Sequence, residues 1–240
     1  TGIRDAELTA LLDDRSFLPS TNPGFLRFPL AKRQKTAAAI PWSRKRKYHE
    51  RIARAAARHR LPFETVAHHF AEAHLLDEAR QYRICAGEQA CAAQDYPRAL
   101  SQIEEALRIW PWTEDPEDRL RILKEMARCA SNAGRPELAR KAWQELNDYA
   151  TEEDLPALRV EALSQLAALA TDLSGISLLL RTAAEIATDH LPAGDAARRW
   201  IAYAEQLAMR VRVRLAGDAL QQAGKLAAKA KNPALDSELL

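Results

Sequence analysis

The sequence predicts an all-α protein in which antiparallel helix pairs stack into an α-solenoid, preceded by a small unit of mixed structure. Three observations predict this class. Of the 240 residues, 47% are hydrophobic and only 8 are glycine, which favours long helices over strands joined by tight turns. Turn signals recur at helix-length intervals after residue 61, and a short pattern of small residues repeats beside three of those turns. We therefore expect helical repeats over most of the chain.

Residues 1–60 predict a small winged-helix-like unit. A turn rich in Pro, Asn and Gly separates two short apolar stretches, which is typical of a hairpin, and Pro41 separates two helical stretches. Ser43 is the expected N-cap of the second of these helices, which is strongly basic. The expected elements are a helix, a hairpin and two further helices, over residues 6–14, 17–28, 30–40 and 43–60.

Residues 61–240 predict helices separated by brief polar turns, with at least four antiparallel helix pairs. Gly, Pro, Asn and Asp mark the breaks, because these residues favour turn conformations. The breaks are expected near residues 76–77, 94–95, 111–116, 134–136, 154–156, 174–175, 192–195, 217–218 and 232–233. The intervals between them are of helix length, and none has the alternating pattern of a strand.

Three of these turns are followed by a small residue at the same offset, namely Ala79, Ala99 and Ala139. Around the second and third turns, small and large residues fall in the order typical of a tetratricopeptide repeat. The matching positions are Gly87, Ala99, Ile103, Ala106 and Pro111 in one copy, and Ala127, Ala130, Gly134, Ala139 and Trp143 in the next. Small residues let paired helices approach closely, and large ones fill the space between them. The fold class is therefore predicted to be a tetratricopeptide-like helical repeat superhelix.

Catalytic and metal-binding motifs are missing from the sequence. It contains no G-x-x-x-x-G-K-[ST] phosphate loop and no G-x-S-x-G nucleophile motif. Glu64, His68 and Glu72 share one helix face, but H-E-x-x-H is absent, and such pairs are ordinary on solvated helix faces. His69 and Phe70 are expected to pack the first repeat. We therefore expect a chain that is not an enzyme and that needs no cofactor or metal.

The cysteines and the hydropathy pattern favour a cytoplasmic protein without a membrane partner. Cys85, Cys91 and Cys129 form no C-x-x-C pair and lie in apolar helical stretches. We expect all three to be inert, buried packing residues in a reducing compartment. No apolar run reaches the roughly 18–20 residues needed to span a bilayer, and residues 1–20 lack an apolar signal core.

Charge is spread unevenly along the chain. Residues 1–60 contain 14 Lys and Arg against 5 Asp and Glu, a net charge of +9, although the whole chain carries only +2. The predicted basic surface consists of Arg44, Lys45, Arg46, Lys47 and Arg51. Docking on an acidic neighbouring domain, or a merely solvated helix face, is the favoured interpretation, and direct contact with nucleic-acid phosphates is the alternative.

A second candidate site is the groove of the third repeat unit. In tetratricopeptide pairs, certain first-helix positions face the concave groove, and here they are Arg121, Lys124, Arg128, Ser131 and Asn132. Three cations one helical turn apart would suit a peptide or ligand that carries a carboxylate. The alternative is a solvated helix face whose cations pair with Glu117 and Glu125.

Several short blocks of the sequence resemble a known family in their order along the chain. They are Phe25-Leu-Arg-Phe28, Ile40-Pro-Trp-Ser43, Arg46-Lys-Tyr-His-Glu-Arg-Ile-Ala53, Val66-Ala-His-His-Phe70, Ala86-Gly-Glu-Gln-Ala90 and Tyr96-Pro-Arg-Ala-Leu100. Over residues 8–110 the chain resembles the region that follows the ATPase core in bacterial signal-transduction ATPases with numerous domains. This family includes LuxR-type and antibiotic-regulator-type transcription activators and cyclase-fused ATPases.

The resemblance implies a winged helix that packs on a nucleotide-binding domain, followed by helical repeats that sense a ligand or partner. It implies a non-catalytic interaction or sensor module, with a protein, peptide or small effector in the repeat groove and an upstream ATPase domain of the same polypeptide as a further partner. A DNA-binding unit using the basic winged helix is the alternative. The family usually has a histidine where this chain has Pro29, and we expect the chain alone not to bind ATP.

Overall fold

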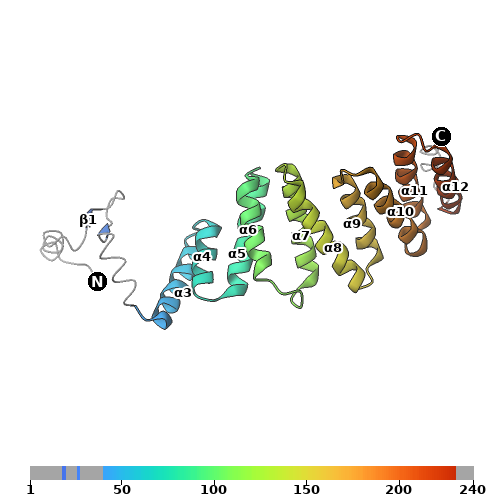
Figure 1. The fold of residues 1–240 in the computed structure, drawn as a ribbon. Helices are drawn as coiled ribbons and strands as arrows, with labels where there is room; N and C mark the ends of the chain where they lie inside the picture. Colours follow the sequence, from blue (N-terminus) through green and yellow to red (C-terminus); the bar gives the residue numbers. More distant parts are fainter. Residues whose placement is uncertain (1–17, 20–25, 28–39, 231–240) are drawn as a thin grey trace, which may run out of the picture. The chain divides into compact units, whose positions relative to one another are not determined.

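The computed structural model describes residues 18–19, 26–27 and 40–230. Two short strands, β1 (Leu18–Pro19) and β2 (Leu26–Arg27), pair in antiparallel fashion with Leu18 opposite Arg27, where the hairpin is predicted (Figure 1). The helices expected over residues 6–14 and 30–40 lie outside the described residues, as does Pro29. The winged-helix-like unit therefore stays a prediction.

The rest of the described chain consists of ten helices joined by short turns (Figure 1). They are α3 (Trp42–Arg58), α4 (Phe63–Glu72), α5 (Leu76–Ala92), α6 (Tyr96–Arg108), α7 (Pro116–Asn132), α8 (Pro136–Glu152), α9 (Pro156–Leu169), α10 (Leu173–His190), α11 (Ala193–Ala208) and α12 (Val213–Ala230). The predicted all-α solenoid is confirmed.

The chain divides into two compact units, Thr1–Ala79 and Arg80–Leu240. In the first unit, α3 packs against α4. In the second, each helix from α6 to α12 packs against the next one along the chain, which is the arrangement of a solenoid repeat. The predicted division into a winged-helix-like unit over residues 1–60 and repeats over residues 61–240 stays a prediction.

The small residues of the repeat pattern lie in the core of the second unit. Ala99, Ala127, Ala130 and Ala139 are fully buried in one apolar cluster, together with Ile103 and Trp143. Gly87 of α5 meets α6 so closely that an added Cβ would lie 2.6 Å from Ile103 Cγ1. The predicted roles of these residues as close-approach and filling positions are therefore confirmed.

Six helices end in the same type of turn. In each, one residue has a positive φ, and the next residue donates its backbone N–H to the carbonyl five residues earlier, as in a Schellman cap. The positive-φ residues are Arg60, His74, Gln94, Gly134, Asp154 and Val211. The corresponding hydrogen bonds run from Leu61 to Ala56, Leu75 to Phe70, Asp95 to Ala90, Arg135 to Ala130, Leu155 to Ala150 and Arg212 to Leu207, with lengths of 2.8–3.0 Å. Only one of these six positions is glycine.

Two local expectations are wrong. The break expected at 217–218 lies inside α12, because Ala216, Ala219 and Ala223 bury one face of that helix while Gly217 sits on the exposed side. The chain turns instead just before α12, where Val211 adopts φ 58°. Ser43 is not the N-cap of α3, since Pro41 holds that position and the helix begins at Trp42.

Two buried arginines fix the loop between α6 and α7. Arg119 donates through Nη1 to the carbonyl oxygens of Leu107 and Trp110, at 3.0 and 2.7 Å, and through Nη2 to Glu145 at 2.7 Å. Arg80 bonds Glu114 at 2.8 Å, and its guanidinium lies 4.7 Å from the centre of the Trp110 ring. Arg119 thereby joins the C-terminal end of α6 to α8, with its positive charge where the α6 dipole favours it.

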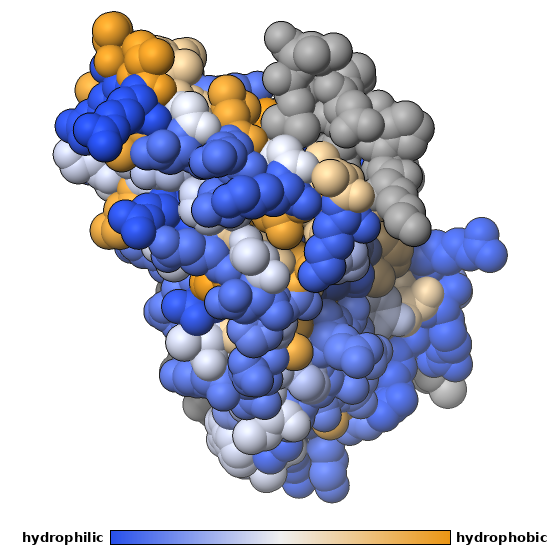
Figure 2. All heavy atoms as spheres, turned by 90° about the vertical axis from the view of Figure 1, so that its right-hand side faces the viewer, coloured by the Kyte–Doolittle hydropathy of each residue, from blue (hydrophilic) through white to orange (hydrophobic). Residues whose placement is uncertain are grey.

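The C-terminal helices expose several large apolar side chains. Figure 2 views the molecule from the right-hand side of Figure 1 and shows hydrophobic surface gathered toward the upper left, among hydrophilic side chains. Leu173, Leu178, Met209, Val211 and Val213 are each at least 62% exposed. They lie outside the groove described below and supply control positions for its tests.

A candidate partner-binding groove

The predicted cationic stripe is present on α7. Arg121 and Arg128 are exposed and Lys124 is half-exposed, while Ile122, Leu123 and neighbouring positions turn into the core. The stripe and the buried face follow from the spacing of three and four residues along one helix. Ala127, Ala130, Ala139 and Trp143 are buried, as expected.

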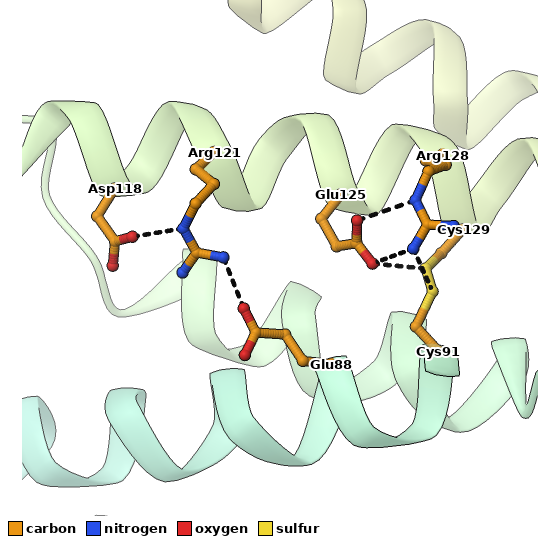
Figure 3. Close-up of polar contacts among 7 residues, drawn as sticks. All are labelled: Glu88, Cys91, Asp118, Arg121, Glu125, Arg128 and Cys129. Carbon is orange, nitrogen blue, oxygen red and sulfur yellow. Dashed lines mark hydrogen bonds and ion pairs between the residues drawn. A yellow bond between two sulfur atoms is a disulfide. The ribbon is translucent and has the colours of Figure 1, made fainter. Parts of the chain in front are cut away.

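Each of the three cations is paired with a carboxylate. Arg121 bonds Asp118 at 2.7 Å and Glu88 of α5 at 2.6 Å, so that α5 and α7 are joined (Figure 3). Lys124 bonds Glu161 of α9 at 2.6 Å. Hydrogen bonds to Asp118 and Glu88 raise the pKa of Arg121. These pairs bring the first helices of consecutive helix pairs together and neutralise much of the positive charge of the stripe.

Arg128 pairs within its own helix. Its guanidinium bonds Glu125 at 2.5 Å, and this hydrogen bond raises the pKa of Arg128 (Figure 3). The alternative of a solvated helix face predicts pairs with Glu117 and Glu125. The pair with Glu125 is present, whereas Arg121 pairs with Asp118 and Glu88 instead of Glu117. Ser131 and Asn132 are exposed at the end of α7, and the Ser131 hydroxyl donates to the carbonyl of Ala127 at 3.0 Å.

A groove of about 670 Å³ lies beside the first half of the stripe. Its apolar wall consists of Leu120, Leu155, Pro156, Ala157, Leu158 and Leu191. Its polar rim consists of Glu117, Arg121, Lys124 and His190. The start of α7, the start of α9 and the turn after α10 form it together. The structure thus brings Arg121 and Lys124 to a groove, while Arg128, Ser131 and Asn132 do not line it.

The apolar wall was not among the predicted site residues. Leu155 and Leu191 each stand immediately before a proline, in a turn that opens a helix. A leucine in such a turn falls outside the helical periodicity that predicts core positions, so periodicity does not mark it as a site residue. The Leu-Pro dipeptides at two helix starts were the available signal.

The residues of the predicted basic surface differ in their structural roles. Arg46 is a packing residue, since its Nε donates to the carbonyl of Ala73 at 3.0 Å and its guanidinium lies 4.9 Å from the Trp42 ring centre. Arg44, Lys47 and Arg51 are exposed on α3, and Lys45 is partly so. A shallow groove of about 510 Å³ on this helix is lined by Tyr48, Arg51, Ile52, Arg54, Ala55 and Arg58.

Three histidines meet where α3 packs on α4. His49 Nδ1 lies 3.0 Å from His69 Nδ1, and the rings of His68 and His69 are 5.2 Å apart. At 3.0 Å one of the two Nδ1 atoms must donate and the other accept, so these two facing nitrogens hold one proton between them. Burial, followed by the charges of His49 and His68, lowers the pKa of His69 below its ordinary value of 6.5, and only Glu72 opposes this shift.

This cluster predicts that acid destabilises the α3–α4 pair. Because the pKa of His69 is lower in the folded protein than in the unfolded chain, the unfolded chain binds more protons as the pH falls below about 6.5. Stability is therefore fully present above that pH and is lost below it. We expect thermal melts to show a smaller loss between pH 7.5 and pH 5 for His69→Gln than for the wild type. His59→Gln, at an exposed position, is the control, and an equal loss in His69→Gln and the wild type would contradict the prediction.

The three cysteines differ from the expected uniform packing role. Cys91 of α5 and Cys129 of α7 are buried and joined by a disulfide, with Cα atoms 6.4 Å apart. The expectation that they are inert packing residues is wrong, because the packing of α5 on α7 brings the two sulfurs together. The expectation that Cys85 is buried is also wrong, since this cysteine is exposed.

Comparison with known proteins supports the fold. No protein-family model matches the sequence, and no curated protein is significantly similar to it. The structure is similar to the apo form of RapI, with a TM-score of 0.52 and 12% identity, over 87% of this chain and 61% of that one. It is also similar to nearly identical tetratricopeptide-like repeats of a Podosopora anserina kinesin light chain, with a TM-score of 0.51 and 16% identity, over 80% of this chain and 99% of that one.

These similarities show that the chain has a tetratricopeptide-like helical repeat fold. The chain spans about 61% of the length of RapI, so it corresponds to part of that protein. Within residues 40–230, every helix is too short or too polar to cross a membrane.

Proposed function

We propose that this chain is a non-catalytic interaction module that binds a peptide segment of a partner protein in the groove formed by α7, α9 and the turn after α10. The observation that carries the proposal is the combination of an apolar wall and a charged rim in one groove of about 670 Å³. Grooves of this size and lining are typical of sites that bind small ligands and peptide side chains. Stacked helix pairs commonly use such surfaces for recognition.

The groove favours a peptide with apolar anchors flanked by acidic residues. Leu155 and Leu158 offer an apolar wall, and burying one leucine-sized side chain contributes about 1.5–3 kcal/mol. The ion pairs of Arg121 and Lys124 are solvent-exposed, and such pairs contribute only about 0–1 kcal/mol. A carboxylate of the partner can therefore replace Asp118 or Glu161 at little cost.

The wider context is a proposal that rests on the resemblance to signal-transduction ATPases. In that setting the chain is a sensor region of a cytoplasmic signalling ATPase or transcription regulator, and the exposed basic face of α3 docks on an acidic surface of the ATPase domain. The observation in favour of docking is that Tyr48 and Ile52 are nearly half exposed beside Arg51 and Arg58, which suits a protein surface better than phosphates alone. Nucleic acid is the competing partner for this face.

The test is a peptide-library selection against the purified chain, followed by anisotropy titration of the selected peptides. Leu155→Glu should weaken their binding about 10- to 100-fold, because it removes an apolar anchor site that is 38% exposed in the free chain. The double variant Arg121→Glu/Lys124→Glu should weaken binding of acidic peptides selectively. Leu173→Glu, on the exposed apolar surface outside the groove, is the matched control. Equal affinity for Leu155→Glu and Leu173→Glu would exclude the groove.

A further inference from the structure

A compact cluster of reactive groups lies between α5 and α7. The disulfide of Cys91 and Cys129 closes a separation of 38 residues, and the two side chains are 5% and 0% exposed. Figure 3 shows the same two helices joined a second time by the pair of Arg121 and Glu88. The first helices of two consecutive helix pairs are thus held by one covalent bond and one ion pair.

The charged neighbours of the two sulfurs are of opposite sign. Arg128 Nη2 lies 3.5 Å from Cys91 Sγ, and Glu125 Oε1 lies 3.8 Å from Cys129 Sγ (Figure 3). In the reduced protein, the guanidinium favours a negative charge on Cys91, and thiolates are the attacking species in disulfide exchange. The Glu125 carboxylate is in position to accept the proton of the Cys129 thiol. Arg128 therefore favours Cys91 as the nucleophile, and Glu125 can serve as the base for Cys129.

Cys85 provides an internal contrast on the same helix. It is exposed, but partial desolvation and the negative charge of Glu88 raise the pKa of its thiol, so less of the reactive thiolate is present near neutral pH. No other sulfur of the described chain is bonded to it. Cys85 is therefore expected to remain a free thiol under conditions in which Cys91 and Cys129 react.

We propose that Cys91 and Cys129 are a reversible redox site that locks α5 to α7 when it is oxidised by a low-molecular-weight disulfide. The Cys91 thiolate attacks one sulfur of the small disulfide, forming a mixed disulfide and releasing one small thiolate. Glu125 then takes the proton of Cys129, whose thiolate attacks Cys91 Sγ and releases the second. In total, two protein thiols and one small disulfide give the Cys91–Cys129 bond and two small thiols.

Formation of the Cys91–Cys129 disulfide affects the proposed peptide groove through Arg121. This residue lines the groove and is bonded to Glu88 on α5, so fixing α5 against α7 also fixes one rim of the groove. This consequence rests on the proposed function, whereas the redox chemistry does not. Regulation of binding by oxidation follows if both are correct.

A metal site is the competing use of the same residues. The ligand atoms of Cys91, Glu125 and Cys129 lie within 4.8 Å of one another. However, the Arg128 guanidinium already bonds the Glu125 carboxylate and contacts Cys91, and a fixed positive charge there disfavours a cation. The observations therefore favour disulfide chemistry.

The experiment follows the thiols of the full chain in mixtures of reduced and oxidised glutathione. Acid-quenched samples are alkylated, and peptide mass spectrometry identifies which cysteines are bonded. We expect the Cys91–Cys129 bond to form and to be removed by dithiothreitol, with Cys85 alkylated throughout. Arg128→Leu should slow the formation of the bond about tenfold, and Arg181→Leu, an exposed arginine on α10, should leave it unchanged. Glu125→Gln should cause the mixed disulfide at Cys91 to accumulate.

Two further readouts complete the test. Amide exchange in α5 and α7 should be slower in the oxidised than in the reduced chain, with α11 and α12 unchanged as the internal control, and this readout needs no peptide ligand. A disulfide that resists reduction in the folded chain would overturn the proposal in favour of a permanent crosslink. Zinc bound at one ion per reduced chain, with loss on Cys91→Ser and protection from alkylation, would overturn it in favour of a metal site.

Discussion

Replacing Arg119 with methionine is expected to lower the free energy of unfolding by about 2–4 kcal/mol. The side chain is 8% exposed and holds three acceptors, namely two carbonyl oxygens at the end of α6 and Glu145 of α8. Methionine fills much of the same volume but donates no hydrogen bond. The buried carbonyl of Trp110 would then be left without a donor, at about 1–3 kcal/mol, whereas the carbonyl of Leu107 would keep the backbone N–H of Trp110 at 3.2 Å.

Urea unfolding followed by circular dichroism measures this effect, with Arg121→Met as the matched control two residues away. Arg121 is exposed, and removing its ion pairs should change stability by about 0–1 kcal/mol. Equal unfolding midpoints for the two variants would mean that Arg119 does not hold the α6–α7 loop.

Replacing Ala139 with tryptophan is expected to destabilise the second unit by about 1–3 kcal/mol or more. Ala139 is fully buried in the cluster that contains Ala130 and Trp143, so the larger ring can fit only if α7 and α8 move apart. Because each repeat stabilises its neighbours, the loss should spread beyond α8.

The measurement is thermal unfolding together with amide exchange across α7 and α8. Lys141→Trp, two residues further along α8 at an exposed position, controls for the tryptophan itself and should melt close to the wild type. A melting temperature for Ala139→Trp equal to that of Lys141→Trp would contradict the assignment of Ala139 as a close-approach position.

The helical repeat could be predicted because its causes are local in sequence. Gly87 and Ala139 are small where helices touch, and the turns before Pro136 and Pro156 are marked by proline. The turn at Val211 could not be predicted, since its left-handed conformation is imposed by the packing of α11 on α12 and not by a glycine. The break predicted at Gly217 is wrong, because burial of one face of α12 outweighs the low helix propensity of a single residue.

The candidate site was only partly predictable. The register of α7 predicts that Arg121 and Lys124 share a face, because the spacing of a helix is fixed. Their partners Glu88 and Glu161 lie 33 and 37 residues away, and the disulfide partners 38, so these contacts depend on how the helix pairs stack. A single sequence contains no signal for that stacking angle.

The most direct test of the proposed groove is photo-crosslinking from within it. A benzoylphenylalanine introduced at Leu155 lies in the groove wall, and one at Leu173 lies on exposed apolar surface elsewhere. With a peptide selected by the wild-type chain, irradiation should crosslink the variant at 155 and not the variant at 173, and excess unlabelled peptide should abolish the product. Equal crosslinking at both positions, or crosslinking at 173 alone, would contradict the assignment of this groove as the partner-binding site.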